Sequence, residues 1–372
     1  MLKDSVAALA TDIDELVAAD PASLAGGEAI VALRRQLERL SAVATRASVA
    51  FDAGRAWEAD GARSAAAWIS SRCRLPLPLA RRQVRLGRSL REMPATEAAW
   101  LAGEISQAQV EPLAAVRTRV GAELFDPDEA ALVGYARQLP HRDFMRTLAY
   151  WTQAADPDGV EDDAEAQRDS RRLHLSQSLD GKWFLDGVLD PISGEVVSRA
   201  LKAIEDELFE ADRAAANGGA LARTPAQRRA DALVELARRA AAMPAGGRLP
   251  EPLLTVLVGY ETFAGRVCEM ESGTVVTPGS LLPWLTKAYI ERVVFDSPDR
   301  VKNVGVRRRL FGGATRRAVE VRDRECFSEY CDLPADQCEI DHVQPYGEGG
   351  LTVDDNGRPA CRYHNRRRNQ PP

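Results

Sequence analysis

Long apolar runs are missing from this chain of 372 residues. No uncharged stretch approaches the ~18 apolar residues that a membrane-spanning helix needs, so the sequence predicts no transmembrane segment. The first twenty residues carry five acidic side chains and no apolar core stretch, which is not the pattern of a secretory signal peptide. Internal repeats are also missing. We therefore expect a soluble cytoplasmic protein that has no membrane partner.

A strong charge of one sign is missing too. The net charge is −6, which gives no signal for nucleic acid over the chain as a whole. The charge is uneven, however: from Val301 onward there are 13 Lys and Arg against 11 Asp and Glu, whereas the remainder has 36 against 44. A mildly basic C-terminal part within an acidic protein fits a restricted nucleic-acid surface.

Histidine and cysteine are scarce, with four and six residues, but two of the histidines and four of the cysteines lie between Cys326 and His364. In a reducing compartment, clustered cysteines favour metal ligands over disulfides. Four residues separate Cys326 from Cys331, and two separate Cys361 from His364. Two such pairs joined by a long loop have the spacing of a closed tetrahedral zinc site. Cys338 is either a spare thiol or a replacement for one of these ligands.

Composition divides the chain into three parts of an α+β protein. Residues 1–150 are rich in Ala, Leu, Arg and Glu and have few β-branched runs, which predicts a helical domain. Residues 151–300 are expected to form an α+β continuation. Residues 314–372 are expected to form a small module that contains the cysteine cluster.

The middle part contains the predicted strands. Its acidic beginning, residues 155–170, is poor in apolar residues and is expected to be an exposed loop. Alternating residues around an Asp-Gly pair predict a β-hairpin near 171–190. Helices are predicted at 192–214 and 224–242, the second with a Thr-Pro pair as its N-cap and first residue. The Gly/Pro-rich residues that follow, 243–252, predict a linker.

The C-terminal module is too small to hold a self-sufficient apolar core. A structural zinc supplies roughly 10–16 kcal/mol of apparent binding free energy. This is comparable with the stability of a whole domain, about 5–15 kcal/mol. Zinc is therefore expected to decide whether the module folds.

A second cluster consists of the adjacent residues Asp341 and His342, with Asn356 and Asn365 further along. If the adjacent pair ends a strand, its side chains point to opposite faces, so one can bind a catalytic metal while the other faces a water molecule. Imidazole suits the role of general base because it titrates near neutral pH. On a helix that begins near Cys361, Asn365 is rotated by about 100° from the residue before it. One helical turn can therefore supply ligands to a structural zinc and to another metal.

These residues resemble the ββα-metal module of the HNH endonucleases. That module has, in order, a cysteine pair, Asp-His, a Gly-Gly loop, Asp-Asn, and a second cysteine pair followed by His or Asn. Here the glycines are Gly349 and Gly350, and Asn356 precedes Cys361 at the spacing usual for the family. The ligand pairs resemble a subgroup found in many actinobacterial proteins, in which a large helical domain of unknown function precedes the module. The signature of that helical domain is similar to residues 56–64, 101–106 and 223–233.

The resemblance implies a role for each residue. His342 is similar to the general base that activates water against a phosphodiester, and Asp341 to the metal ligand that precedes it. Asn356 resembles the residue that holds the loop and orients the base, and Asn365 stands where the family often has a final histidine ligand. An Asp/Asn oxygen pair suits Mg²⁺ or Mn²⁺ better than zinc. The family's structural zinc ligands are similar to Cys326, Cys331, Cys361 and His364.

The implied function is a metal-dependent DNA endonuclease with a helical domain that binds DNA, a partner or another copy of itself. Because Asn365 is a weaker ligand than histidine, the alternative is a zinc-containing nucleic-acid-binding protein with weak or no cleavage. Arginine forks suit phosphate, although a solvated C-terminal tail is the other interpretation. The predicted DNA contacts are Arg358, Arg362, Arg366, Arg367 and Arg368.

Overall fold

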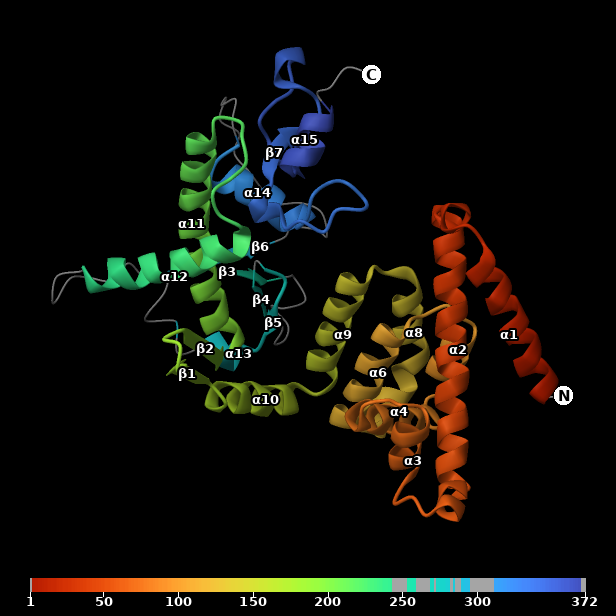
Figure 1. Cartoon of the computed structure of the whole chain (residues 1–372). Helices are drawn as coiled ribbons and strands as arrows, with labels where there is room; N and C mark the ends of the chain where they lie inside the picture. Colours follow the sequence, from red (N-terminus) through yellow and green to blue (C-terminus); the bar gives the residue numbers. More distant parts are fainter. Residues whose placement is uncertain are drawn as a thin grey trace. The chain divides into compact units, whose positions relative to one another are not determined.

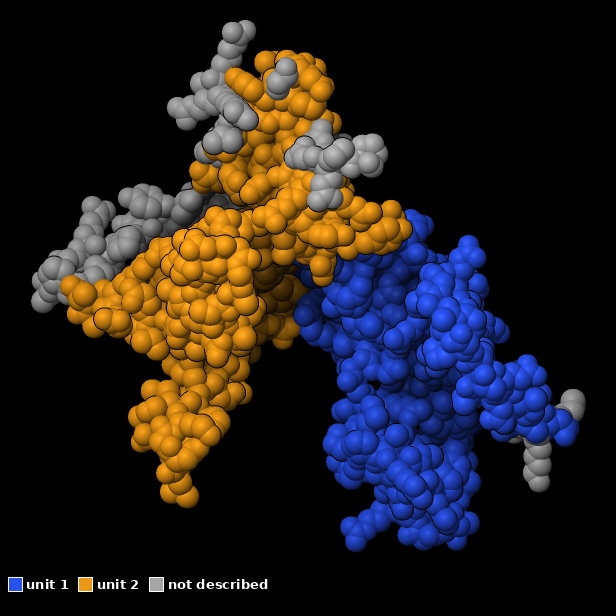
Figure 2. Space-filling view, turned by 45° about the horizontal axis from the view of Figure 1, so that its top comes forward, with its two compact units in different colours: residues 1–155 blue, residues 156–372 orange. Residues whose placement is uncertain are grey.

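The computed structural model describes residues 2–242, 253–258, 268–270, 272–281, 284, 289–294 and 311–368. The chain divides into two compact units, Met1–Ala155 (unit 1) and Asp156–Pro372 (unit 2), which Figure 2 colours separately. Helices dominate both units, and unit 2 also contains small sheets (Figure 1). This confirms the predicted α+β class. The linker expected at 243–252 lies outside the described residues.

Unit 1 is built from helices that short turns connect. Two starts are capped as their sequences indicate: the Ser64 hydroxyl accepts from the Ala67 N–H at 3.1 Å, and Ser106 forms a capping box with Gln109. The helices are α1 (Leu2–Ala18), α2 (Gly27–Ala53), α3 (Ala65–Arg72), α4 (Leu77–Leu90), α5 (Pro94–Leu101), α6 (Gln107–Val120), α7 (Ala122–Phe125), α8 (Glu129–Gln138) and α9 (His141–Ala155), with 3₁₀ turns at Pro21–Leu24, Ala56–Asp60 and Asp126–Asp128.

The core of unit 1 lies between α2, α4, α5, α6, α8 and α9. Trp100, Phe125, Phe144 and Met93 are fully buried there. The indole N–H of Trp100 donates to Glu38 Oε2 at 2.9 Å, so this large side chain is buried with its polar atom satisfied. The core therefore combines apolar burial with a specific hydrogen bond that fixes α5 against α2.

A glycine sets the close approach of α2 and α4. A Cβ added at Gly87 would lie 2.2 Å from Cγ2 of Val49 and 3.0 Å from Cγ2 of Thr45. Both of these α2 residues are buried, so they have little room to move. Only glycine fits at this crossing without displacing α2.

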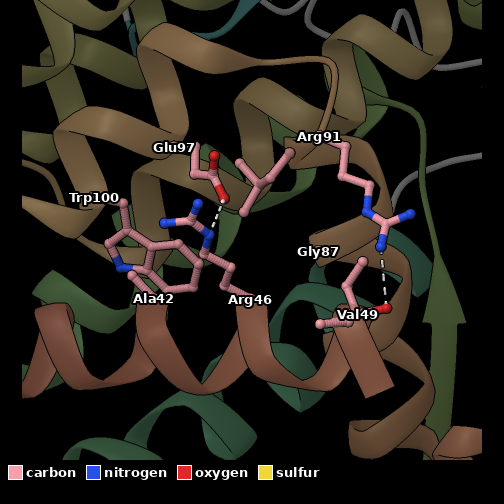
Figure 3. Close-up of a pocket in the computed structure, with 9 residues that line it drawn as sticks. Ala42, Arg46, Val49, Gly87, Arg91, Glu97 and Trp100 are labelled. Carbon is pink, nitrogen blue, oxygen red and sulfur yellow. Dashed lines mark hydrogen bonds and ion pairs between the residues drawn. The ribbon is translucent and has the colours of Figure 1, made fainter. Parts of the chain in front are cut away.

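A pocket of about 300 Å³ lies beside this crossing (Figure 3). Trp100 forms part of its apolar wall, and its charged residues are Arg46, Arg91 and Glu97. Arg46 pairs with Glu97 across 3.7 Å, and Arg91 donates to the Val49 carbonyl at 3.2 Å. The charges of the pocket are therefore largely satisfied by the protein itself, and no residue of the cysteine cluster lines it.

The variant Gly87→Ala is expected to lower the free energy of unfolding by about 1–3 kcal/mol, because overpacking a buried crossing forces neighbouring side chains out of place. Urea denaturation followed by circular dichroism measures this. The matched control is Gly134→Ala on α8, where an added Cβ meets nothing within 4 Å. There alanine should stabilise the helix by up to about 1 kcal/mol. Equal effects at the two positions would contradict the packing argument.

In the residues that the structure describes, unit 2 combines helices with three small sheets. Its helices are α10 (Pro157–Asp169), α11 (Pro191–Ala216), α12 (Pro225–Ala241), α13 (Pro278–Leu281), α14 (Gly313–Asp323) and α15 (Arg362–Arg368). Its strands are β1 (Arg172–Gln177), β2 (Trp183–Val188), β3 (Leu253–Val258), β4 (Cys268–Met270), β5 (Val275–Val276), β6 (Tyr289–Val294), β7 (Glu339–His342) and β8 (Gly357–Ala360). None of the described helices combines the length and apolarity needed to cross a membrane.

The prediction of an exposed loop at residues 155–170 is wrong, because residues 157–169 form helix α10. Asp156 caps it by accepting from the Gly159 N–H at 3.1 Å, and proline occupies the first turn. On the helix, Glu161 accepts hydrogen bonds from the Thr277 hydroxyl at 2.7 Å and the Gly279 N–H at 2.9 Å. Asp156 thus caps the helix and Glu161 anchors it. The scarcity of apolar residues in this segment therefore did not indicate a loop.

The sheets of unit 2 are separate. In the four-stranded sheet the order is β5-β4-β3-β6, with β3 and β6 parallel and the other pairs antiparallel. β1 and β2 form an antiparallel hairpin with Leu175 opposite Leu185, and the turn contains Gly181 at a φ of 81°. Positive φ favours glycine, which explains the Asp-Gly pair. β7 and β8 form the third sheet, in the C-terminal module.

Candidate metal centre and active site

The cysteine cluster lies in a small module, residues 311–368, made of two strands between two helices. α14 precedes the cluster, β7 and β8 pair as antiparallel strands, and α15 follows β8 directly (Figure 1). In this register Asp341 lies opposite Arg358, and His342 lies opposite Gly357. Because side chains alternate along a strand, Asp341 and His342 belong to opposite faces of the hairpin.

α14 packs against β8 at a glycine. A Cβ added at Gly357 would lie 2.7 Å from atoms of both Phe311 and Val319, so the missing side chain lets helix and strand meet. Arg322 at the end of α14 donates to the Asp354 carbonyl at 2.7 Å and to the Gly357 carbonyl at 2.6 Å. These contacts fix the start of β8 relative to the helix.

The structure brings the four predicted zinc ligands together. Each offers one atom, and these atoms all lie within 4.8 Å of one another in Cys326, Cys331, Cys361 and His364. His364 Nδ1 is 3.3 Å from Cys326 Sγ and 3.1 Å from Cys361 Sγ, while the Cys331 and Cys361 sulfurs are 3.9 Å apart. Among the described residues this is the one group of histidine, cysteine and acidic side chains with such spacing.

The cluster fits a tetrahedral ion. With Zn–S bonds of about 2.3 Å, two sulfurs at tetrahedral angles lie roughly 3.8 Å apart, close to the Cys331–Cys361 separation of 3.9 Å. Burial raises the pKa of the Cys326 thiol, but the backbone N–H groups of Cys361 and Ser328 and the His364 ring lower it to about 7 overall. A thiol of this kind readily supplies the thiolate that a metal requires.

Cys338 is not part of this group of four, which favours a spare thiol over a replacement ligand. Its thiol is buried beside the cluster and lies 3.8 Å from the Leu333 carbonyl. Burial and the neighbouring cysteines raise its pKa to about 12. Cys338 is therefore a neutral thiol that packs against the ligand loop.

Asp341 and Asn365 lie on the side of the hairpin where α15 packs, and each contacts a charged neighbour. Asn365 Nδ2 donates to Glu339 Oε2 at 2.6 Å, and Arg358 Nη2 lies 3.4 Å from Asp341 Oδ2. Glu339 and Asp341 are two residues apart on β7 and so share a face. Glu339 was not predicted from the sequence, although this alternation was a signal that could have identified it.

His342 belongs to the other face of β7. Its Nε2 is 2.9 Å from the hydroxyl of Thr352, which is buried. The rings of Phe311 and Tyr346 lie beside it, with centroids 4.6 and 5.7 Å away. The imidazole is therefore oriented by contacts that include the hydrogen bond with Thr352 and the two aromatic rings. Thr352 and both aromatic residues were not predicted from the sequence, because they have no fixed spacing from the histidine.

Asn356 holds the loop that follows β7. Its Oδ1 accepts from the Gln344 N–H at 2.8 Å, and its Nδ2 donates to the carbonyls of Leu351 at 2.7 Å and Gln344 at 3.2 Å. A Cβ added at Gly350 would lie 2.0 Å from the Gln344 carbonyl oxygen, so glycine permits this tight closure. The loop begins directly after His342, so its closure by Asn356 also fixes the end of the strand that carries the imidazole.

The predicted DNA-contacting arginines have different surroundings. Arg358 places its guanidinium 3.9 Å from the centre of the Phe327 ring and is only about a quarter exposed. Arg366 is exposed on α15, and Arg367 donates to the Tyr363 hydroxyl at 3.3 Å. The side chain of Arg368 lies outside the described residues. A phosphate-binding role for this set stays a prediction.

Ion pairs join the module to the rest of unit 2. Arg362 donates to Glu210 of α11 at 2.9 Å and lies over the Phe209 ring, 5.4 Å from its centre. Arg324, just after α14, pairs with Glu269 of β4, whose side chain is 1% exposed. The module is therefore attached to the four-stranded sheet and to α11 by charged contacts.

Comparisons with known proteins agree with this geometry. Residues 28–323 match the family described as a domain of unknown function (DUF222), and residues 328–370 match the family described as HNH endonuclease. No curated protein and no solved structure matches the chain. The first match covers more than half of the sequence. The chain thus belongs to the DUF222 family and carries an HNH endonuclease domain at its C-terminal end.

Proposed function

We propose that the protein is a metal-dependent endonuclease that hydrolyses phosphodiester bonds in DNA. The HNH endonuclease match over residues 328–370 supports a nuclease. The observation that carries the finer proposal is the arrangement at the end of β7. Asp341 shares a face with Glu339 and lies on the side where Asn365 packs, while His342 follows it directly on the opposite face of the strand.

His342 is the proposed general base. Its imidazole takes a proton from a water molecule whose oxygen forms a bond to phosphorus, while the bond from phosphorus to the leaving sugar oxygen breaks. The contacts with Thr352 and Phe311 support this role because they hold the ring in one orientation. Asn356 supports it indirectly by fixing the loop after the strand.

The proposed catalytic metal site consists of Asp341 and Asn365, with Glu339 as a further oxygen donor. Carboxylate and amide oxygens suit Mg²⁺ or Mn²⁺. A half-turn of the Asn365 amide group would exchange the positions of its nitrogen and its oxygen. The amide oxygen would then lie next to the Glu339 carboxylate, where both could bind a cation. A divalent cation at this site supplies positive charge that offsets the phosphate and the developing negative charge on the leaving oxygen.

Zinc is the proposed ion for Cys326, Cys331, Cys361 and His364. Three thiolates and one imidazole form a closed donor set with no position left for a substrate, which is typical of a structural site. The cluster joins the loop before β7 to the start of α15. Its proposed role is therefore to hold β7, β8 and α15 in the arrangement that the chemistry needs.

DNA is the proposed substrate because exposed arginines follow the site on α15. Arg366 and Arg367 extend from the same short helix as Asn365. Guanidinium groups pair with phosphate oxygens and position a strand without reading its sequence.

Nicking of supercoiled plasmid tests the proposal. The full chain should convert plasmid to the open circle with Mg²⁺ or Mn²⁺, and EDTA added before the metal should stop the reaction, because the proposed oxygen site depends on an added cation. Zinc content, measured by atomic absorption, distinguishes loss of the catalytic metal from loss of the structural ion.

A protein that keeps its zinc and retards plasmid in a gel shift, yet nicks it with neither metal, would contradict the endonuclease proposal. That result would favour the alternative of a nucleic-acid-binding protein in which Asn365 no longer supports cleavage. The gel shift should weaken steeply with added salt, since phosphate contacts release counterions.

A further inference from the structure

Arg358 lies beside the proposed catalytic metal site, although a guanidinium cannot itself bind a cation. In the pairing of β7 with β8 it is directly opposite Asp341, so the two side chains belong to the same face of the hairpin. Arg358 Nη2 lies 3.4 Å from Asp341 Oδ2, and the two side chains are only 25% and 19% exposed. Water and salt therefore screen this pair less than a pair on the open surface. A positive side chain shares the carboxylate that is proposed to bind the divalent cation.

The Phe327 ring holds the guanidinium in place. The centre of the ring is 3.9 Å from Cζ of Arg358, within the range of a cation–π contact. Phe327 directly follows the ligand Cys326, and its backbone N–H donates to the Pro359 carbonyl at 2.8 Å. Its ring also meets the edge of His364, with centroids 6.2 Å apart. The cysteine cluster thus fixes the ring, and the ring fixes the guanidinium beside its carboxylate partner.

Arg358 is nevertheless not fully hydrogen-bonded where it lies. Its Nε is buried and has no hydrogen-bond partner in the part of the chain that the structure describes. A buried donor without a partner is unfavourable, and in native proteins such a group calls for an explanation, a functional role among them. The planar fork of a guanidinium matches the oxygens of a phosphate group. A movement of the fork from Asp341 to a phosphate would therefore pair donors that are only partly paired here.

We propose that Arg358 competes with the divalent cation for the Asp341 carboxylate, and that a phosphate group of bound DNA receives the guanidinium when the cation takes its place. This competition deepens the proposed endonuclease function, on which it rests. A positive charge beside an oxygen ligand weakens the binding of a dication, so the site holds its cation weakly until a phosphate neutralises Arg358. Arg358 then couples the binding of the metal to the binding of DNA.

Binding of Mn²⁺ to the full zinc-loaded chain without DNA tests the competition, with free Mn²⁺ measured by electron paramagnetic resonance. Arg358→Gln is expected to bind Mn²⁺ roughly tenfold more tightly than the wild type, because a positive charge near the dication is removed. Arg358→Lys keeps the charge and is expected to bind Mn²⁺ as the wild type does. The matched control Arg366→Gln removes an exposed charge from the same module, and solvent screening should leave its Mn²⁺ affinity nearly unchanged.

Nicking of plasmid at saturating Mn²⁺ tests the transfer of the guanidinium to phosphate. Although Arg358→Gln binds the metal more tightly, its single-turnover rate is expected to fall at least about tenfold, because the phosphate loses a charged donor. A residue that only supported the fold would, when replaced, weaken metal binding and nicking together. The opposite signs of the two effects therefore distinguish the competition from a loss of packing.

Weaker or unchanged Mn²⁺ binding by Arg358→Gln would overturn the inference, even if the wild type nicks plasmid. An undiminished nicking rate in that variant would overturn it as well. If no form of the chain nicks plasmid, the endonuclease proposal fails, while tighter Mn²⁺ binding by the variant still supports the competition for Asp341. Should Arg358→Gln lose its zinc, Arg358→Met replaces it in both measurements, because methionine keeps an apolar stem over Phe327.

Discussion

The variant His342→Ala is expected to nick supercoiled plasmid about 10²–10⁴-fold more slowly than the wild type at the same metal concentration. The reason is the loss of the imidazole that the proposal assigns as general base. The methyl group also leaves the buried Thr352 hydroxyl without its partner at 2.9 Å, at a cost of about 1–3 kcal/mol of stability. Single-turnover nicking rates measure the effect, and zinc content should be unchanged because His342 is outside the cluster.

The matched control for this experiment is His141→Ala. His141 is exposed at the start of α9 in unit 1 and contributes to neither cluster. Its replacement should leave the nicking rate unchanged. If His342→Ala and His141→Ala both cut as fast as the wild type, the assignment of the general base is wrong, whatever the identity of the metal.

The variant Cys326→Ser is expected to release the structural ion and unfold the C-terminal module. Loss of one thiolate removes a large part of the roughly 10–16 kcal/mol that a structural zinc supplies, and such a module has too small a core to compensate. Atomic absorption should find about one zinc per wild-type chain and little in the variant. Limited proteolysis should then cleave the β7–β8 region rapidly while the helices of unit 1 persist.

Cys338→Ala provides the control, because Cys338 is buried next to the cluster but is not one of the four ligands. It should keep its zinc, with at most a modest loss of stability from the missing sulfur. Retention of one zinc by Cys326→Ser together with its loss from Cys338→Ala would show that the ligand set was chosen wrongly.

The metal cluster could be predicted from the sequence because its ligands form two pairs that are close together in the sequence. Cys326 and Cys331 lie in one loop and Cys361 and His364 on one helical turn, so the spacing within each pair reflects the geometry of an ion. The adjacency of Asp341 and His342 likewise placed them on opposite faces of a strand. In each case the chemistry constrains residues that are close in the sequence.

Contacts between distant segments could not be predicted in this way. Arg362 donates to Glu210, which lies 152 residues earlier, and no local pattern connects them. The acidic segment before the hairpin was expected to be a loop because it lacks apolar residues. It is helical because Asp156 caps it and Glu161 is anchored by Thr277, more than a hundred residues later.

The position of α14 determines where the HNH part can be separated from the rest of the chain. The helix closes the stretch that matches DUF222, yet Val319 fills the space left by Gly357, and Arg322 binds carbonyls at the start of β8. Helix α14, which belongs to the DUF222 match, therefore covers part of the interior of the HNH part. A fragment that begins at residue 328 would lack this helix, so it is expected to unfold more readily than a fragment that begins at residue 311.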